Sequence, residues 1–437
     1  MNTTTVLVIG SGGRESALVY GYGKSKHVDR ILAVPGNDHM QDITGAPVFL
    51  FPSISVTDRE KIIQLCKDRD VTLVDIAPDK AVAAGLGDAL KQAGILFVGP
   101  TKHAGQIEWD KQWSRKFMEK FGISHPSFDC FSSIQKALAF LRTQPNKPWV
   151  IKANGLADGK GVILTRNNEE AQQAVLEMRR FGTAGTTFLL EEYLEGEEFS
   201  TFVVSDGVSW KTIGSAQDHK LVFDGDKGPN TGGMGCSTPP LLLTQRIKNY
   251  IDTGIITKTI DGMRKIGRPY TGILYLGGIV VKGKPYVIEF NARWGDPEAQ
   301  VLLPGLVSDL FEMSYAVAKG DMSKAKIRMD TKARVVIAGC AKGYPSDYTA
   351  AMGKEIFGLQ DARCIKGTHI FGAGIQRKKG KDYVNGGRLF YIVGEGKDVI
   401  AARKKAYKAM SLIHIQGDNL HYRTDIGWRD VKRLRKK

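Results

Sequence analysis

The chain lacks long apolar runs and contains few cysteines. No apolar stretch reaches the ~18–20 residues that a helix needs to span a bilayer. The first residues, MNTTTVLVIG, lack the basic flank and small-residue cleavage site of a signal peptide. The five cysteines are far apart and never form a CxxC pair; they are Cys66, Cys130, Cys236, Cys340 and Cys364. We therefore expect neither a zinc site nor a disulfide framework, and we predict a protein of the reducing cytoplasm.

Acidic residues are fewer than basic ones: 46 Asp and Glu residues against 62 Lys and Arg residues give a formal net charge of +16. This excess suits either a nucleic-acid-binding protein or an enzyme that handles anionic phosphates. The basic residues form short runs, for example at 377–379 and 432–437, and such runs are usually solvated surface. Because no aromatic and basic recognition module accompanies them, we predict small-molecule substrates and no specific nucleic-acid partner. We also expect no membrane partner and a monomer.

Strands and helices alternate over the first hundred residues. An apolar run at 3–9 ends in the glycines of GSGG, and the helix that follows has Ala17, Leu18 and Tyr22 on one face. The other predicted elements are strands at 31–34, 71–76 and 96–98 and helices at 58–69 and 81–93. This alternation predicts a parallel, doubly wound sheet.

The pattern changes after about residue 104. The predicted elements are a helix at 111–120, strands at 149–153, 188–192, 286–290, 334–338 and 387–393, and a helix at 397–410. Glycine-rich loops occur at 155–161 and 225–235, and we predict that 217–235 is one long polar loop. The chain length allows two to four domains, and these patterns favour three domains or subdomains.

The first glycine loop has two interpretations. In a dinucleotide-binding fingerprint that includes Gly10 and Gly12, the third glycine would fall at position 15, which is Glu. The loop could still hold a single phosphate on its backbone N–H groups, with Arg14 beside it. It could equally be a tight turn from strand to helix, and this segment alone does not separate the two.

A lysine ends the predicted strand at 149–153. Alternation places Lys152 on the same face as Val150, and a loop with three glycines and a second lysine, Lys160, follows. Burying an unpaired ammonium group is costly, so a phosphate partner explains Lys152 better than a purely structural role. The loop lacks the G-x-x-x-x-G-K-[ST] pattern of a Walker A motif.

Two acidic segments follow. The first, LLEEYLEGEE at 189–198, is either a strand that ends in a solvated turn or a hinge that receives an adenine base. In the second, VIEFNARWGDPE at 287–298, alternation puts Glu289 and Asn291 on one face of a strand. Two oxygen ligands at this spacing suit Mg²⁺, and Arg293 would continue the same face if the strand persisted.

Together these segments resemble the phosphoribosylamine–glycine ligase family, which uses the ATP-grasp fold. The motifs that carry the resemblance lie between Val6 and Trp428 in the order VIGSGGRE, PGN, FGISHP, VIKANGLADGKGV, EEYLEGEE, SAQDHK, GPNTGGMG, YTGILY, VIEFNARWGDPEAQ, NGGR and DIGW. The resemblance implies α/β and α+β domains: a preATP-grasp domain with a parallel sheet (1–103), an ATP-grasp domain of two subdomains (104–330) and a small mixed α/β C-terminal domain (331–437).

The resemblance also implies a reaction of purine synthesis. ATP phosphorylates the glycine carboxylate, and the amine of 5-phosphoribosylamine then displaces phosphate to give glycinamide ribonucleotide. The expected cofactors are ATP and Mg²⁺, with Mn²⁺ as an alternative metal. By position, the resemblance implies that ATP is contacted by Lys111, Lys152, Glu191, Glu192, Tyr193, Leu194, Glu198 and Asn230. It implies that the metal is bound by Glu289 and Asn291. The implied catalytic residues are Lys152, Asp218 and Arg293. The implied substrate-binding residues are Gly12, Gly13, Arg14, Asp218, Arg293 and Asp296.

The chain departs from the family pattern mainly in the N-terminal pocket. GGREHA has Ser16 in place of its histidine, and GPEAPL is replaced by APDKAV, which places Asp79 and Lys80 there. DHKR has become DHKL, so Leu221 replaces an arginine that approaches ATP in the family, and Lys227 could compensate. Two alternatives therefore stay open: a ligase with a different amine substrate, and a non-catalytic nucleotide-binding relative.

Overall fold

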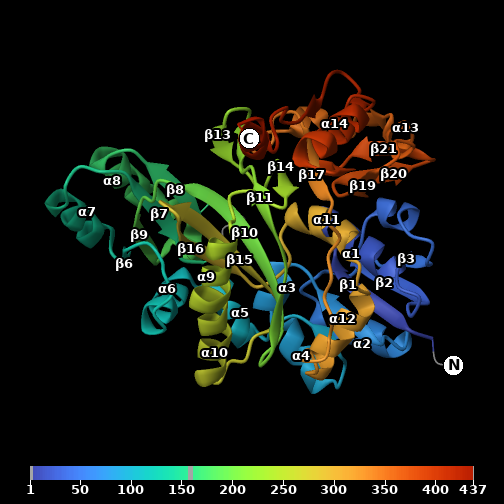
Figure 1. Ribbon diagram of the computed structural model, residues 1–437, viewed down its shortest axis with the longest axis horizontal. Helices are drawn as coiled ribbons and strands as arrows, with labels where there is room; N and C mark the ends of the chain where they lie inside the picture. Colours follow the sequence, from blue (N-terminus) through green and yellow to red (C-terminus); the bar gives the residue numbers. More distant parts are fainter. Residues whose placement is uncertain (1–2, 156–160, 437) are drawn as a thin grey trace.

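A computed structural model describes residues 3–155 and 161–436. Gly159 and Lys160 of the predicted lysine loop lie outside these residues. Within the described ranges, no helix combines the length and the apolar character needed to cross a membrane. Figure 1 shows three groups of elements: the N-terminal sheet at the lower right, the β6–β9 sheet at the left, and the C-terminal elements at the top.

The N-terminal residues form a five-stranded parallel sheet in the order β3-β2-β1-β4-β5. Its strands are β1 (Thr5–Gly10), β2 (Arg30–Pro35), β3 (Val48–Leu50), β4 (Leu73–Ile76) and β5 (Phe97–Val98). Its helices are α1 (Gly13–Gly23), η1 (Asp38–Asp42), α2 (Arg59–Asp68), α3 (Asp79–Ala83) and α4 (Leu86–Gln92). Every residue of β1 is buried, as expected for a parallel strand covered on both faces.

One prediction in this region is wrong. The helix predicted at 81–93 is two helices, α3 and α4, because Gly85 between them has φ +81°, a conformation that does not continue a helix. The apolar spacing across 82–93 remained helical because both halves bury residues against the same sheet.

A four-stranded sheet in the order β6-β9-β7-β8 forms the lobe at the left of Figure 1. Its strands are β6 (Phe128–Phe131), β7 (Trp149–Ala153), β8 (Val162–Thr165) and β9 (Phe188–Glu192). The helices of this part are α5 (Lys102–Trp109), α6 (Lys111–Lys120), α7 (Ile134–Thr143), α8 (Asn168–Glu177) and η2 (Met178–Gly185). Buried side chains of α7 and α8 pack with those of β7 and β9.

A nine-stranded sheet connects the middle of the chain to its C-terminal part. Its order is β16-β15-β10-β11-β14-β17-β22-β19, with β24 paired to β17. The middle part contributes β10 (Glu197–Asp206), β11 (Trp210–Asp218), β14 (Gly235–Thr238), β15 (Thr271–Val281) and β16 (Lys284–Asn291). Its helices are α9 (Gln245–Tyr250), η3 (Ile251–Ile256), α10 (Thr257–Lys265), α11 (Glu298–Leu302), η4 (Leu303–Gly305) and α12 (Leu310–Lys319).

The C-terminal part adds a second small sheet, ordered β20-β21-β18-β23. The strands of the whole C-terminal part are β17 (Ala333–Ala341), β18 (Glu355–Phe357), β19 (Thr368–Gly372), β20 (Ile375–Lys378), β21 (Lys381–Val384), β22 (Arg388–Gly396), β23 (His414–Ile415) and β24 (Leu420–His421). Its helices are η5 (Thr349–Ala351), α13 (Leu359–Arg363), α14 (Val399–Met410) and α15 (Trp428–Arg435). The predicted fold class, with a parallel N-terminal sheet followed by antiparallel sheets, is confirmed.

The predicted long loop at 217–235 is a second wrong prediction. It contains the end of β11 and a short hairpin of β12 (Leu221–Phe223) and β13 (Lys227–Asn230), with Leu221 paired to Asn230. The turn uses Gly225 at φ +70° and Asp226 at φ +54°, residue types that accept this left-handed conformation. The polar composition concealed the hairpin because β13 has no apolar residue besides Pro229.

Candidate active site

A cleft of about 510 Å³ lies between the β6–β9 sheet and the strands β10, β11 and β16. Its walls include most of the side chains predicted from sequence. These are Lys111, Lys152, Glu191, Glu192, Tyr193, Leu194, Glu198, Asp218, Asn230, Glu289, Asn291, Arg293 and Asp296. Gly12, Gly13 and Arg14 are absent from the described lining and lie next to one end of the cleft.

Lys152 is buried at the end of β7, as alternation predicted, and it has a protein partner. Its Nζ lies 2.8 Å from Glu191 Oε2 on β9 and donates to the Ile288 carbonyl oxygen at 3.2 Å. Arg115 on α6 binds the same carboxylate with two hydrogen bonds, 2.7 Å and 2.9 Å long. Burial alone would raise the pKa of Glu191, but Arg115 and Lys152 hold this pKa at about 2.

Register explains why these groups meet. β7 and β9 are antiparallel neighbours, so the positions that face the cleft on both strands are fixed by their pairing. Two cations share one buried carboxylate, so the cluster retains positive charge towards the cleft. Arg115 was missed in the sequence because a basic residue on an amphipathic helix normally points to solvent.

Lys111 begins α6 on the same wall. The N-cap Asp110 accepts a hydrogen bond from the backbone N–H of Trp113 at 3.0 Å. The Nζ of Lys111 donates to the carbonyl oxygen of Gly155, at 3.1 Å. Burial lowers the pKa of the Lys111 ammonium, which favours any arrangement that brings an anion beside it.

Glu289 lies on β16 opposite these lysines. Burial alone would raise its pKa, but nearby Lys220, Lys152, Lys111 and Arg293 lower it below its ordinary value. Within the described part of the chain, no hydrogen bond or ion pair engages its carboxylate. An ionised carboxylate that faces a cleft in this way is suited to a cation or to water.

Asn291 ends β16, and Arg293 lies beyond the strand. The strand does not persist to Arg293, the condition for a shared face, but the side chains still meet, with Arg293 Nη2 donating to Asn291 Oδ1 at 3.1 Å. The same nitrogen lies 3.1 Å from Glu108 Oε1, a partner that sequence reasoning missed. The Nδ2 of Asn291 is buried without a hydrogen-bond partner among the described residues.

These two residues fit a divalent metal. Glu289 offers an ionised carboxylate, and Asn291 offers an amide oxygen with a second lone pair beside its bond from Arg293, two positions along one strand and on one wall of the cleft. Described His, Cys, Asp and Glu residues form no group of three or more able to hold a metal by themselves. A metal held here would therefore complete its shell with phosphate and water oxygens, as Mg²⁺ commonly does.

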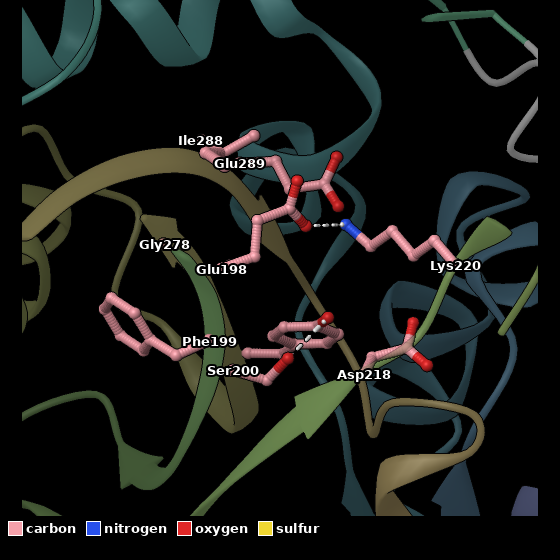
Figure 2. Close-up of a pocket in the computed structure, with 10 residues that line it drawn as sticks. Glu198, Phe199, Ser200, Asp218, Lys220, Gly278, Ile288 and Glu289 are labelled. Atoms are coloured by element: carbon pink, nitrogen blue, oxygen red, sulfur yellow. Dashed lines mark hydrogen bonds and ion pairs between the residues drawn. The ribbon is translucent and has the colours of Figure 1, made fainter. Parts of the chain in front are cut away.

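A smaller hollow adjoins the cleft between β10, β11 and β16. Figure 2 shows Glu198, Glu289 and Lys220 with their charged ends directed towards one another, and Asp218 below Lys220. Lys220 Nζ lies 3.0 Å from Glu198 Oε2. Burial and nearby Glu298 raise the pKa of Asp218, so its carboxyl group holds a proton more readily than an exposed one.

His219 points away from this hollow, as the consecutive positions of 218–220 required. It is buried and its Nε2 accepts the backbone N–H of Gly427 at 2.9 Å. Desolvation lowers the pKa of His219, which keeps the imidazole neutral. It also lines the larger cleft, and its bond to Gly427 makes it a contact to the C-terminal part of the chain.

The first glycine loop lies beside Asp296. Gly12 N donates to Glu15 Oε2 at 2.7 Å, and Arg14 Nε donates to Glu15 Oε1 at 2.6 Å. Arg14 also donates to the Trp294 carbonyl oxygen at 3.1 Å, which joins the loop to the segment after β16. A Cβ at Gly13 would lie 2.2 Å from a ring carbon of Tyr391, so close packing alone requires glycine there.

Arg388 on β22 completes this end of the cleft and was missed in the sequence. It lies 2.9 Å from Asp296 Oδ2 and also donates to the carbonyl oxygen of Gly232. Its motif, NGGR, is one of those that carry the family resemblance, which implies no role for the arginine. The sequence signal for a partner such as Arg388 is Asp296 in the segment RWGDP, because a carboxylate there needs a cation from another part of the chain.

Comparison with known proteins decides the family. Residues 4–108, 109–299 and 333–429 match the N domain, the ATP-grasp (A) domain and the C domain of phosphoribosylglycinamide synthetase. A phosphoribosylamine–glycine ligase of Streptococcus pneumoniae is 38% identical over 98% of this chain and all of its own length. The chain belongs to the phosphoribosylamine–glycine ligase family.

Other members of the family differ in length. The trifunctional purine biosynthetic protein adenosine-3 of Gallus gallus is 40% identical over 98% of this chain, which spans 42% of that protein. The crystal structure of the phosphoribosylamine–glycine ligase of Thermotoga maritima superposes with a TM-score of 0.78 at 29% identity, covering 97% of this chain and 100% of the other. Family membership implies ATP and a divalent metal, in agreement with the expectation from sequence.

Proposed function

We propose that the protein joins glycine to 5-phosphoribosylamine with ATP, giving glycinamide ribonucleotide, ADP and phosphate. The observation that supports this most directly is the set of cations around Glu289. Lys111, Lys152, Lys220 and Arg293 all lower the pKa of this carboxyl group and line one cleft with it. Such a cluster suits the triphosphate of ATP and the charge that develops as its terminal phosphoryl group moves.

The nucleotide occupies the end of the cleft near β9 in this proposal. The backbone of Glu191–Leu194 and the side chains of Tyr193 and Leu194 receive adenine, because the Glu191 carboxylate is already bound by Arg115 and Lys152. Glu198 binds the ribose hydroxyls, and Asn230 on β13 lies over the triphosphate. Lys111 and Lys152 contact the phosphates.

Glu289 and Asn291 hold the metal, which we propose is Mg²⁺, with Mn²⁺ as an alternative. When bound, the metal would neutralise phosphate oxygens and lower the cost of charge on the transferring group. Glu289 would hold it through its carboxylate, whose pKa is lowered by nearby Lys220, Lys152, Lys111 and Arg293.

In the first step a glycine carboxylate oxygen attacks the terminal phosphorus of ATP, and ADP leaves. Arg293 positions the carboxylate of glycine, since its guanidinium lies beside Asn291 at the edge of the cleft. Asp218 faces the ammonium group of glycine. A cation there would reverse the rise in the pKa of Asp218. No protein nucleophile takes part in this step.

In the second step the amine nitrogen attacks the carbonyl carbon of glycyl phosphate. A C–N bond forms, phosphate leaves with the bonding electron pair, and the nitrogen loses a proton to solvent. Gly12, Gly13 and Arg14 receive the phosphate of the amine substrate, and Asp296 lies near its ribose. Among the described residues Arg14 is held by Glu15 and the Trp294 carbonyl oxygen, so a phosphate can compete for it.

One alternative keeps the chemistry and changes the amine. It is favoured by Asp79, which lines the cleft where the family carries a longer carboxylate, and by Ser16, which is buried and donates to the Gly372 carbonyl oxygen at 2.6 Å. We also propose domain limits at 103 and 330, a monomer, and a cytoplasmic location consistent with the free cysteines.

The deciding experiment measures ADP release by the purified protein with glycine, with and without freshly made phosphoribosylamine. A panel of other amines and acids is tested in parallel. Release that requires the glycine and phosphoribosylamine pair supports the proposal. Equal or greater release with another amine would replace the substrate, and nucleotide binding without any turnover would favour a non-catalytic relative.

A further inference from the structure

The last strand and helix of the chain contact the β12–β13 hairpin, which carries Leu221 and Asn230 at the edge of the nucleotide cleft. Figure 1 shows the C-terminus beside β13 and β14. We call residues 421–433 the strap. They run from the end of β24 into α15 and are distant in sequence from every element they touch here.

Arg423 is the centre of these contacts and is completely buried. Its Nη1 donates to the Leu221 carbonyl oxygen and to Asp226 Oδ1, both at 2.9 Å. Its Nε and Nη2 form two hydrogen bonds of 2.7 Å to Asp425. One guanidinium group therefore joins the base of the hairpin, its turn and the strap.

The turn of the hairpin is held at further points. Gly225 N donates to Asp425 Oδ2 at 2.8 Å, and Thr424 N donates to Asp224 Oδ1 at 2.8 Å. Arg429 Nη2 donates to Asp226 Oδ2 at 2.5 Å, and Arg429 itself lines the cleft. The hairpin has only four and three residues in its strands, so these bonds supply much of its order.

The strap also reaches the start of β10. Arg433 Nη2 donates to both carboxylate oxygens of Glu197 at 2.6 Å, one residue before Glu198. The same side chain donates to Asp430 Oδ1 at 2.8 Å, within α15. The strap therefore connects the hinge at the start of β10 with the hairpin after β11.

We propose that the strap fixes the hairpin over the nucleotide and that Arg423 and Asp425 are positioning residues for nucleotide binding. This inference rests on the proposed function for the identity of the nucleotide. In this arrangement the C-terminal part of the chain contributes to ATP affinity through the hairpin, although Arg423 and Asp425 do not line the cleft in the described residues.

The test is ADP binding to the full chain, measured by isothermal titration with Mg²⁺ present, for the unsubstituted protein and Asp425→Ala. We expect ADP binding to weaken about tenfold in the variant, within the usual range for coupling between two sites. The KM for ATP should rise by a similar factor, with kcat at saturating ATP nearly unchanged. Asp425→Glu, which keeps a carboxylate, should recover most of the affinity.

Asp330→Ala is the matched control. Asp330 binds the buried Arg334 in the same bidentate way, at 2.8 Å and 2.5 Å, and is likewise absent from the cleft lining. Both variants should lower the melting temperature, but only Asp425→Ala should weaken ADP binding. Hydrogen exchange adds a second readout, since amides of 221–230 should exchange faster in Asp425→Ala and not in Asp330→Ala.

The inference is overturned if Asp425→Ala binds ADP within twofold of the unsubstituted protein, or if both variants lose affinity equally. Failure of the proposed function gives a different result: ADP would still bind and respond to Asp425→Ala, but no turnover would occur with glycine and phosphoribosylamine. A protein that binds no ADP before substitution would contradict both proposals.

Discussion

The two ends of the cleft are built from different kinds of structure. At the nucleotide end, Lys152, Glu191 and Glu289 come from β7, β9 and β16, strands whose neighbours fix their register. At the amine end, Arg14 and Asp79 come from the beginnings of helices that follow loops. Because strand pairing fixes the register, alternation alone predicts which way the side chains of the first group face. The positions of the second group depend on loop geometry and on contacts with the C-terminal part.

Charge is also arranged differently at the two ends. The nucleotide end shares one buried carboxylate between Arg115 and Lys152 and leaves a net cationic surface. At the amine end, Arg14 is neutralised by its neighbour Glu15, and Asp296 by Arg388. The nucleotide end therefore already has a charge that suits a highly anionic ligand. At the amine end, a substrate must replace the contacts that Arg14 and Asp296 make within the protein.

The largest expected effect is on stability at the nucleotide end. Glu191→Gln should lower the free energy of unfolding by about 3–5 kcal/mol, because it leaves two buried cations without their carboxylate. Denaturant unfolding at neutral pH measures this loss. The control Glu192→Gln changes the next residue, which accepts a hydrogen bond from Ser127 and is only partly buried, so its loss should be small.

The same carboxyl group predicts a pH dependence. The pKa of Glu191 is about 2 in the folded protein against an ordinary value of 4.5, so the ionised form stabilises the fold. This contribution is complete above the unfolded value and is lost as the pH falls from 4.5 towards 2. The difference in stability between Glu191→Gln and the unsubstituted protein should therefore shrink over this interval; a difference that stays constant would contradict this role.

The next effect is on catalysis. Glu289→Ala should lower kcat about 10²–10³-fold, the cost of removing a group that organises charge in a transition state. Circular dichroism should show the fold unchanged, because Glu289 faces the cleft. ADP release at increasing Mg²⁺ measures the effect, with Glu195→Ala, an exposed residue of the hinge, as control. Normal turnover in Glu289→Ala would remove this residue from the metal site.

The sequence predicted most of the nucleotide end for a physical reason. Alternation along β7 and β16 placed Lys152, Glu289 and Asn291 on their correct faces, because period-two patterns survive whatever packs around a strand. It did not reach Arg293, because the strand ends after Asn291, and it failed at the β12–β13 hairpin, whose second strand has no apolar residue besides Pro229. Both cases concern short or terminating strands, where few residues carry the pattern.

Partners distant in sequence were beyond prediction. Arg115, Glu108 and Arg388 each bind a predicted site residue, but only the folded chain brings α5, α6 and β22 to those positions. The buried carboxylate of Glu191 required cations, and no rule of spacing indicates which basic residues supply them. The resemblance to the family named the ligand-facing residues without naming the groups that hold them.

A smaller effect should mark the amine end. Arg14→Ala should raise the KM for phosphoribosylamine about tenfold through loss of one charge-assisted contact, while the KM for ATP changes less than twofold. Steady-state ADP release with each substrate varied in turn separates the two values. Arg30→Ala, on β2 of the same N-terminal part and hydrogen-bonded to Thr5 and Arg69, is the control. A parallel rise in the KM for ATP would mean that the ends are not independent.

The smallest effect tests the residue where this chain departs from its family. Asp79 begins α3, lines the cleft and uses one carboxylate oxygen to accept the backbone N–H of Lys80 at 2.8 Å. Asp79→Glu lengthens the side chain by one methylene and should lower the KM for phosphoribosylamine about threefold, the value of one weak hydrogen bond. Asp88→Glu, whose carboxylate accepts the N–H of Lys102 and is not part of the described lining of the cleft, should leave both KM values unchanged. If Asp79→Glu instead raises that KM, the shorter carboxylate fits the amine of this enzyme better than the family residue does, and the pocket is adapted rather than weakened.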